Sequence, residues 1–210
     1  MSVLNTEKID IESVVDELFD FTKSGIIAIP GFVTDDGLQG LQAELLSSRI
    51  KWLKAPRVYG TTYQELDTIY LGEADSLRSD ESFPEVNRLR EEYVKVYERF
   101  AERAKFVPGK VNSVGVHRYQ KGAVGMGPHR DYSQYMNLVS IFVLAGTNTF
   151  GICHDREQKN ITYIQEDEGM LILLRHPRSD TERAYRPLHC VGPVTKERYT
   201  VVLRQDSGKK

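Results

Sequence analysis

The segment Arg198-Tyr-Thr-Val-Val-Leu-Arg204 constrains both the fold and the site of this chain. If it is a strand, the alternation of side chains places Arg198, Thr200 and Arg204 on one face. Arginines that face into a barrel are costly unless anions meet them, and a guanidinium matches a carboxylate by two parallel hydrogen bonds. The segment therefore favours an enclosed site for an acidic ligand, with solvent-exposed arginines on an edge strand as the alternative.

The chain after Gly109 has the pattern of a succession of strands. The segments are short, rich in β-branched or aromatic residues, and separated by polar or glycine-bearing turns. The expected strands are residues 111–119, 138–144, 149–153, 161–164, 169–174 and 199–204.

The first half of the chain is predicted to be mainly helical. Apolar residues recur at helical spacing over residues 11–19 and 86–100,. Thr34 is suited to cap the start of another helix, and Pro84 is suited to open the last one. Helices followed by a run of strands predict an α+β, mainly β fold, in which a jelly-roll barrel or sandwich carries the N-terminal helices on one face.

The length and composition suit one globular domain. The chain has 210 residues, of which 40% are hydrophobic and 28% charged, and no linker divides it, so residues 1–210 are expected to form a single domain. A helical part, residues 1–108, would precede a β-helix core, residues 109–205. Residues 51–80 fit neither pattern and contain several aromatic and basic side chains, which favours a lid or binding loop.

Charge and cysteine content limit the environment. The formal net charge of -2 argues mildly against affinity for nucleic-acid phosphates, without excluding a local basic patch. No run approaches the ~20 apolar residues of a membrane helix. The N-terminal segment lacks a signal pattern, and Cys153 and Cys190 are too few for a disulfide framework. We therefore expect a cytoplasmic protein with no membrane contact.

Two histidines and a carboxylate have the pattern of a metal site. In Gly127-Pro-His-Arg-Asp131, residues two apart on an extended segment point the same way, so His129 and Asp131 can reach one ion. His189 offers a third ligand, and such a set leaves open the positions that non-haem Fe(II) oxygenases use for a co-substrate and O₂. A lone His-x-Asp is common, however, and a capping aspartate beside a surface histidine is the alternative. His154 and His176 are expected in polar loops.

Four features in order, His129-x-Asp131, His189 and Arg198-x-Thr200, resemble the Fe(II)/2-oxoglutarate-dependent dioxygenase superfamily over roughly residues 111–205. The resemblance implies a double-stranded β-helix with the metal near the mouth of the barrel. It also implies Fe(II) as cofactor and 2-oxoglutarate and O₂ as co-substrates. Since halogenating relatives lack the carboxylate ligand, Asp131 favours oxygenation.

Within the superfamily, the chain looks most like the AlkB-type nucleic-acid dealkylases. His117-Arg118-Tyr119 stands where that branch has Asn-Arg-Tyr, and residues 198–205 are similar to its double-arginine strand. Trp52 and Tyr59 fall where its lid carries aromatics. Residues 132–136 lack the acidic residues that follow the metal motif in AlkB, so its base recognition is not carried over. The candidate substrate contacts are Trp52, Tyr59 and Tyr132.

The resemblance also implies how 2-oxoglutarate would be held. Arg198 would pair with its distal carboxylate, and Thr200 or Tyr119 would add a hydrogen bond. Arg204 would hold the carboxylate next to the metal. His117 replaces the asparagine of the branch, so its contact with the co-substrate differs from the family pattern.

Three functions are consistent with these residues. The first is an Fe(II)/2-oxoglutarate oxygenase acting on a small organic molecule, which the net charge favours. The second is the same chemistry on an alkylated nucleobase, which Lys51, Lys54, Arg57 and the lid aromatics favour. The third is a metal-binding β-barrel sensor without turnover, which the complete triad and arginine strand disfavour. The oligomeric state and the oxidised substrate stay open.

Overall fold

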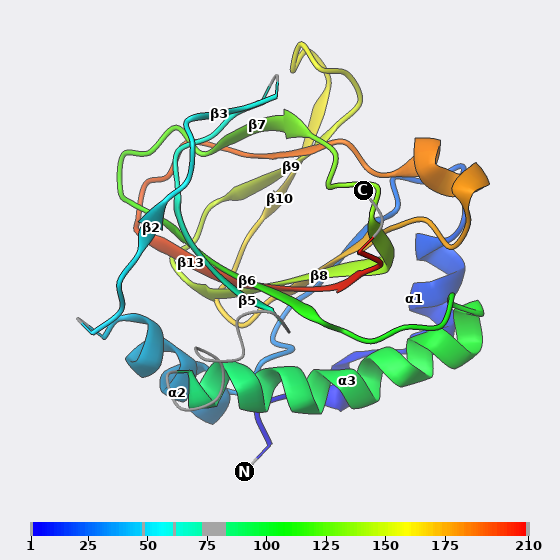
Figure 1. Ribbon diagram of the computed structural model, residues 1–210, viewed down its shortest axis with the longest axis horizontal. Coiled ribbons are helices and arrows are strands. Elements are labelled where there is room, and N and C mark those ends of the chain that lie inside the picture. Colours follow the sequence, from blue (N-terminus) through cyan, green and yellow to red (C-terminus); the bar gives the residue numbers. More distant parts are fainter. Residues whose placement is uncertain (1, 48, 61, 73–82, 209–210) are drawn as a thin grey trace.

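Two antiparallel sheets face one another in the computed structural model, which describes residues 2–47, 49–60, 62–72 and 83–208 (Figure 1). The major sheet has the order β1 (Ile26–Ile29), β11 (Leu171–Arg175), β8 (Tyr135–Ala145), β13 (Arg198–Asp206), β6 (Ser113–Tyr119), β5 (Asp67–Gly72) and β2 (Leu53–Lys54). The minor sheet has the order β10 (Ile161–Gln165), β9 (Thr149–Cys153), β12 (His189–Val191) and β7 (Met126–His129). The strands β3 (Val58–Tyr59) and β4 (Thr62–Tyr63) pair with each other.

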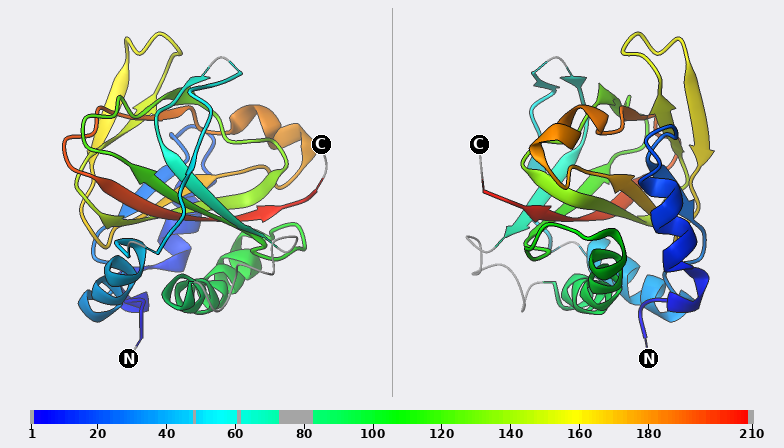
Figure 2. Two further views of the ribbon diagram at one scale, coloured as in Figure 1. Left: turned by 60° about the vertical axis from the view of Figure 1, so that its left-hand side comes forward. Right: turned by 90° about the vertical axis from the view of Figure 1, so that its right-hand side faces the viewer.

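The α-helices are α1 (Ile11–Leu18), α2 (Asp35–Leu45) and α3 (Pro84–Ala104). Figures 1 and 2 show α2 and α3 beneath the major sheet, on the side away from the minor sheet. Two 3-10 turns, η1 (Thr6–Lys8) and η3 (Asp180–Tyr185), complete the described elements. The predicted mainly β jelly roll with N-terminal helices on one face is confirmed.

Strand β13 separates the helix-facing core from the space between the sheets. Tyr199, Val201 and Leu203 are buried in one apolar cluster with residues of all three α-helices. Arg198, Thr200, Val202 and Arg204 face the other way and line a cavity between the sheets. The alternation predicted from the sequence is therefore confirmed, and it follows from the period of two along any strand.

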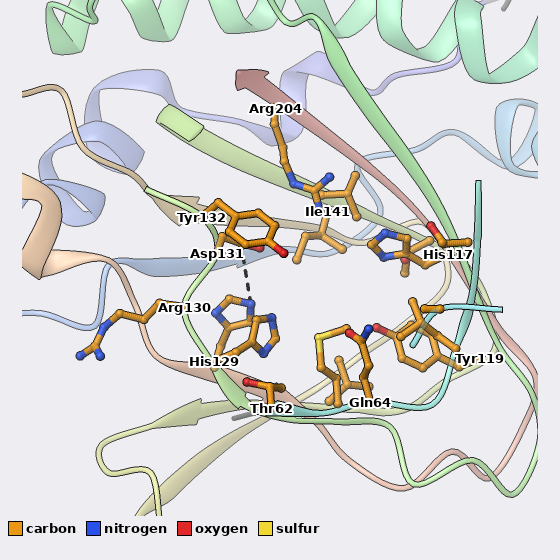
Figure 3. Close-up of a pocket in the computed structure, with 18 of the residues that line it drawn as sticks. Thr62, Gln64, His117, Tyr119, His129, Arg130, Asp131, Tyr132, Ile141 and Arg204 are labelled. Carbon is orange, nitrogen blue, oxygen red and sulfur yellow. Dashed lines mark ion pairs between the residues drawn. The ribbon is translucent and has the colours of Figure 1, made fainter. Parts of the chain in front are cut away.

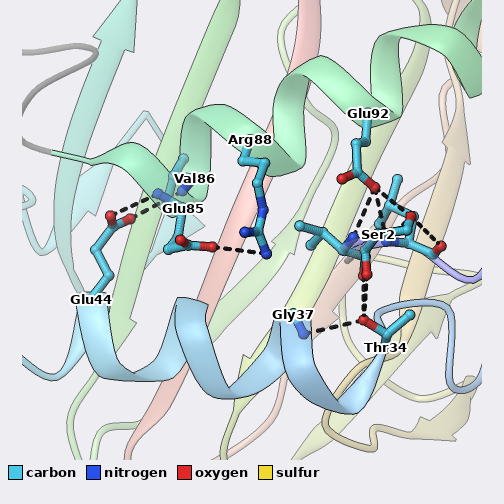
Figure 4. Close-up of polar contacts among 10 residues, drawn as sticks. Ser2, Thr34, Gly37, Glu44, Glu85, Val86, Arg88 and Glu92 are labelled. Carbon is cyan, nitrogen blue, oxygen red and sulfur yellow. Dashed lines mark hydrogen bonds and ion pairs between the residues drawn. The ribbon is translucent and has the colours of Figure 1, made fainter.

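Side-chain hydrogen bonds cap the start of α2 and link α2 to α3 (Figure 4). The Thr34 hydroxyl accepts a hydrogen bond from the Gly37 N–H at 3.1 Å, as expected of a helix cap,. The Glu44 carboxylate accepts from the backbone N–H groups of Glu85 and Val86 at 2.9 and 3.0 Å. A carboxylate at a helix N-terminus satisfies otherwise unpaired donors, so α2 and α3 are joined through the first turn of α3.

Residues 51–80 differ from the expected irregular segment. Residues 67–72 form β5, which pairs with β6 along its whole length and belongs to the major sheet. The remaining described part, residues 51–66, carries three two-residue strands. The portion 73–80 lies outside the described residues. In the part of the chain that the structure describes, no helix is both long and apolar enough to span a bilayer.

Candidate metal centre and its cavity

The predicted triad comes together at the edge of the minor sheet. His129 ends β7, His189 begins β12, and the two residues are register partners in that ladder. Asp131 follows two residues after β7. One ligand atom from each of the three residues lies within 4.8 Å of the others. The donors are two imidazoles and one carboxylate, which fits the Fe(II) facial arrangement.

Backbone carbonyls orient both imidazoles. His129 Nδ1 lies 2.9 Å from the Gly127 carbonyl oxygen, and His189 Nδ1 lies 3.3 Å from that of Pro187. A protonated Nδ1 donates to these acceptors and leaves Nε2 unprotonated, which is the form that binds a metal. Burial and the neighbouring His129 lower the pKa of His189 to about 3. His189 is therefore neutral at physiological pH.

Asp131 is kept ionised by its surroundings. Burial alone would raise the pKa of this carboxyl, but a hydrogen bond from His176 and the charge of Arg204 hold its pKa well below the ordinary value. His176 Nε2 lies 3.7 Å from Asp131 Oδ2. Arg186 donates from Nη1 to the backbone oxygen of Asp131. His189 Nε2 lies 3.9 Å from Asp131 Oδ2, and Figure 3 shows Asp131 next to His129.

A cavity of about 780 Å³ opens beside the triad. Its size is within the range of small-ligand sites. Ile141, Val191 and Val202 contribute apolar walls, and the ring of Phe150 stacks on His189 with centroids 5.3 Å apart. The basic residues that line the cavity are Lys54, Arg130, Arg156, Arg186, Arg198 and Arg204.

Arg204 and His117 carry buried polar atoms without partners. Arg204 is 6% exposed, and among the described residues its Nε and Nη1 atoms have no hydrogen-bond partner; the same holds for His117 Nε2. A Cβ at Gly115 would lie 3.0 Å from His117 Nε2 and 3.1 Å from Arg204 Nη1, so the glycine leaves room for both groups. Unpaired buried donors are costly. An anion in the cavity would satisfy them.

Arg198 also lines the cavity, but it has a partner that the sequence did not predict. Its Nε and Nη2 atoms donate to Glu166 at 2.6 and 2.5 Å. Both side chains are buried, at 2% and 0% exposure. Arg198 Cζ lies 5.0 Å from the ring centroid of Tyr119. Glu166 directly follows β10, and its backbone N–H donates to the Asn148 carbonyl.

Some of the other predicted site residues line the cavity, and others do not. Tyr119 and Thr200 line the cavity near Arg198, and Tyr132 lines it with its side chain 44% exposed. Trp52 does not line it: the indole packs 5.8 Å from the Tyr199 ring, on the opposite face of β13. The expected substrate contact of Trp52 is thus corrected. Tyr59 belongs to β3, but its side chain lies outside the described part of the structure.

The sequence did not predict the positions of His176 and Glu166 beside the site, but it did predict that His154 lies outside it. His176 was expected in a polar loop but is 1% exposed beside Asp131. Glu166 stands in the acidic run Gln165-Glu166-Asp167-Glu168, whose composition indicates a solvent-exposed segment. His154 is exposed, as expected. A histidine directly after a strongly apolar strand was the available signal for His176.

Comparisons with known proteins place the fold. A Trichoplax adhaerens prolyl hydroxylase, solved with a peptide fragment of the hypoxia inducible factor oxygen degradation domain, superposes with a TM-score of 0.69 at 14% identity, covering 94% of this chain and 90% of that one. OsALKBH1 gives 0.60 at 15% identity, covering 87% and 99%. The viral collagen prolyl hydroxylase of Paramecium Bursaria Chlorella virus-1, solved as a 2OG complex, gives 0.56 at 13%, covering 87% and 95%.

These likenesses establish the class of fold. The chain has the jelly-roll architecture of the prolyl hydroxylases and of an AlkB homologue, as the sequence resemblance implied. No protein-family model matches the sequence. No curated protein matches it either. What this chain does is therefore argued from its own site.

Proposed function

We propose that the protein is an Fe(II)- and 2-oxoglutarate-dependent oxygenase that oxidises a C–H bond of a small organic molecule. One observation carries the proposal: the His129, Asp131 and His189 ligand set opens onto the same cavity as the unpaired donors of Arg204 and His117. Iron and a 2-oxo acid together supply the oxidation of a C–H bond by O₂. The residues of this chain bind, orient and shield the reactants.

The residues fit that role on their own chemistry. The imidazole of His189 is neutral and the carboxylate of Asp131 is ionised, as metal ligands must be,. Arg204 and His117 would hold the carboxylate next to the metal. Tyr119 and Thr200 line the same cavity and would contact the rest of the co-substrate. The apolar walls formed by Ile141, Val191 and Val202 would limit the access of water to the reacting bond,.

The likeness to the viral collagen prolyl hydroxylase, whose structure is a 2OG complex, supports the same co-substrate. The cavity volume of about 780 Å³ supports a small substrate, because it is of the size that single small ligands occupy,. We place the activity in a reducing cytoplasm, consistent with the two free, buried cysteines,.

A second candidate, oxidation of an alkylated nucleobase, is favoured by the fold of OsALKBH1 and by Lys54, Arg130 and Arg156 along the cavity. Titration of a single-stranded oligonucleotide at two salt concentrations separates the candidates. Nucleic-acid binding must weaken as salt rises, because phosphate contacts release counterions. Absence of such binding removes the second candidate.

The proposed chemistry is tested by anaerobic reconstitution with Fe(II), followed by 2-oxoglutarate and then O₂. We expect about one iron per chain and release of succinate from 2-oxoglutarate, with both lost in His129→Ala. Iron binding and succinate release retained in His129→Ala would contradict the site. A screen for molecules that stimulate succinate release would then identify the substrate.

A further inference from the structure

We propose that Glu166 sets the class of co-substrate by holding Arg198, so that the cavity selects a 2-oxo acid through its metal-proximal carboxylate and shows little preference for a second, distal one. This inference rests on the proposed function. It depends on a difference between Arg198 and Arg204, two arginines of β13, in whether a carboxylate of the protein pairs with them. Arg198 has a carboxylate partner in its own chain, whereas Arg204 has none among the described residues.

Arg198 and Glu166 form a buried ion pair with two hydrogen bonds. Two of the five N–H groups of the guanidinium are donated to the two oxygens of one carboxylate, at 2.6 and 2.5 Å,. Both side chains are almost completely buried. Burial alone would lower the pKa of Arg198, but the charge and hydrogen bonds of Glu166 raise it above the ordinary value. The pair as a whole carries no net charge toward the cavity.

Glu166 lies behind Arg198 rather than in the cavity. It is 0% exposed and is absent from the cavity walls, while Arg198 is part of them. A distal carboxylate arriving from the cavity would therefore approach a guanidinium whose charge is already neutralised from the other side. The binding free energy that the distal carboxylate gains at Arg198 would be small, because an ion pair is strong only when the charge of the guanidinium is not already compensated.

The uncompensated cation stands at the metal end instead. Arg204 and His117 lie together, because a Cβ at Gly115 would be 3.1 Å from Arg204 Nη1 and 3.0 Å from His117 Nε2. Figure 3 shows Arg204 on the same side of the cavity as Asp131, with Ile141 beside its guanidinium. Arg204 Cζ lies 4.9 Å from the ring centroid of Tyr135, which holds it in place. The Nε and Nη1 atoms of Arg204, which have no partner among the described residues, would hold a carboxylate bound beside the metal.

The experiment compares two acids of equal chain length. 2-Oxoglutarate has two carboxylates, whereas 2-oxopentanoate has a methyl group in place of the distal one. Binding of each acid to the Fe(II)-loaded protein is measured by anaerobic calorimetry, without turnover. We expect the wild-type protein to bind 2-oxoglutarate less than about tenfold more tightly than 2-oxopentanoate. A single charge-assisted hydrogen bond to the distal carboxylate would give a preference of about tenfold or more. Glu166→Gln frees the charge of Arg198 and should raise this preference above about tenfold.

Asp167→Asn is the matched control, because it removes one carboxylate from the exposed neighbour of Glu166. It should leave the preference as in wild type. Should Glu166→Gln fail to fold, Glu166→Gln combined with Arg198→Gln removes both charges. The double variant is expected to keep the wild-type affinity for 2-oxoglutarate within about tenfold.

Three results would overturn the inference while leaving the proposed function intact. One is a wild-type preference for 2-oxoglutarate of tenfold or more. Another is an unchanged preference in a folded Glu166→Gln variant. The third is loss of 2-oxoglutarate affinity in a folded double variant. If neither acid binds the iron-loaded wild type, the proposed function itself fails, and this inference fails with it.

Discussion

The imidazoles of His129 and His189 are in contact across the ladder of β7 and β12, with ring centroids 4.2 Å apart and planes tilted at 54°. Two histidines this close cannot both be protonated without repulsion, and each already places Nδ1 at a backbone carbonyl. The minor sheet therefore presents two Nε2 atoms to one point, with Asp131 next to them. A metal ion would satisfy this arrangement.

Replacing either histidine should abolish metal binding without unfolding the protein. His189→Ala removes one of three ligands, and we expect Fe(II) affinity to fall by more than the roughly 10- to 100-fold that loss of an outer-shell partner costs. His154→Ala is the matched control, since His154 is exposed and outside the cluster. Titration calorimetry with Fe(II) or Mn(II) measures the effect. Equal affinities in the two variants would contradict the assignment.

His176 should tune the metal without binding it. Its Nε2 atom lies 3.7 Å from Asp131 Oδ2, and its Nδ1 atom lies 3.2 Å from the Tyr135 carbonyl oxygen. We expect His176→Ala to weaken metal affinity by roughly 10- to 100-fold, because the carboxylate loses its orienting partner. His176→Gln can still donate a hydrogen bond and should recover part of the loss. An affinity unchanged in His176→Ala would show that Arg186 alone suffices to orient Asp131.

Local patterns predicted the fold because they are set by near neighbours in the chain. The alternation from Arg198 to Arg204 is correct at every position, and the strand predicted over residues 149–153 is found at those bounds. Thr34 caps α2 and Pro84 opens α3, as their side-chain chemistry indicates. The pairing of the candidate ligands His129 and Asp131 was predictable because a His-x-Asp step on an extended segment is itself local.

The parts of the site that were missed depend on the pairing of distant strands. Glu166 is 32 residues from Arg198, and only the antiparallel ladder of β9 and β10 turns it inward from an acidic run that looks solvated. His176 is buried because β11 ends beside Tyr135, a contact between segments 41 residues apart. The register between paired strands cannot be predicted from the composition of either strand alone. The sequence alone therefore indicates the candidate ligands but not the buried residues that contact and orient their neighbours.

Asn137 should be essential for stability but not for metal binding. It has a left-handed backbone, with φ of 63°, and is 0% exposed. Its side chain accepts from the Val107 N–H at 3.0 Å and donates to Gln205 Oε1 at 2.7 Å. Asn137→Ala leaves these buried groups unpaired, so unfolding free energy should fall by about 3 kcal/mol or more.

Asn137→Gly is the matched variant, because it loses the same hydrogen bonds but tolerates positive φ. It should be about 0.5–1 kcal/mol less destabilised than Asn137→Ala, the net of relieved strain and added chain entropy. Denaturant unfolding measures both variants. If alanine is tolerated as well as glycine, the left-handed backbone at residue 137 is not a source of strain.

His117 should make the metal-free protein less stable in acid. Burial, and next the charges of Arg204 and Arg198, lower the pKa of His117 from 6.5 to about 3. Because the folded pKa is the lower one, the unfolded chain binds more protons between pH 3 and 6.5. The unfolding free energy must therefore decrease as pH falls through that window, by up to about 1.4 kcal/mol per pH unit for this group.

His117→Asn removes this titrating group. The unfolding free energy of the variant should therefore fall less steeply with pH than that of wild type, by a difference in slope that corresponds to about one proton. His154→Asn controls for loss of a histidine at an exposed position. Urea unfolding of metal-free protein at intervals from pH 4 to 7 measures the slopes, and parallel curves for wild type and His117→Asn would mean that His117 takes up its proton in the folded state.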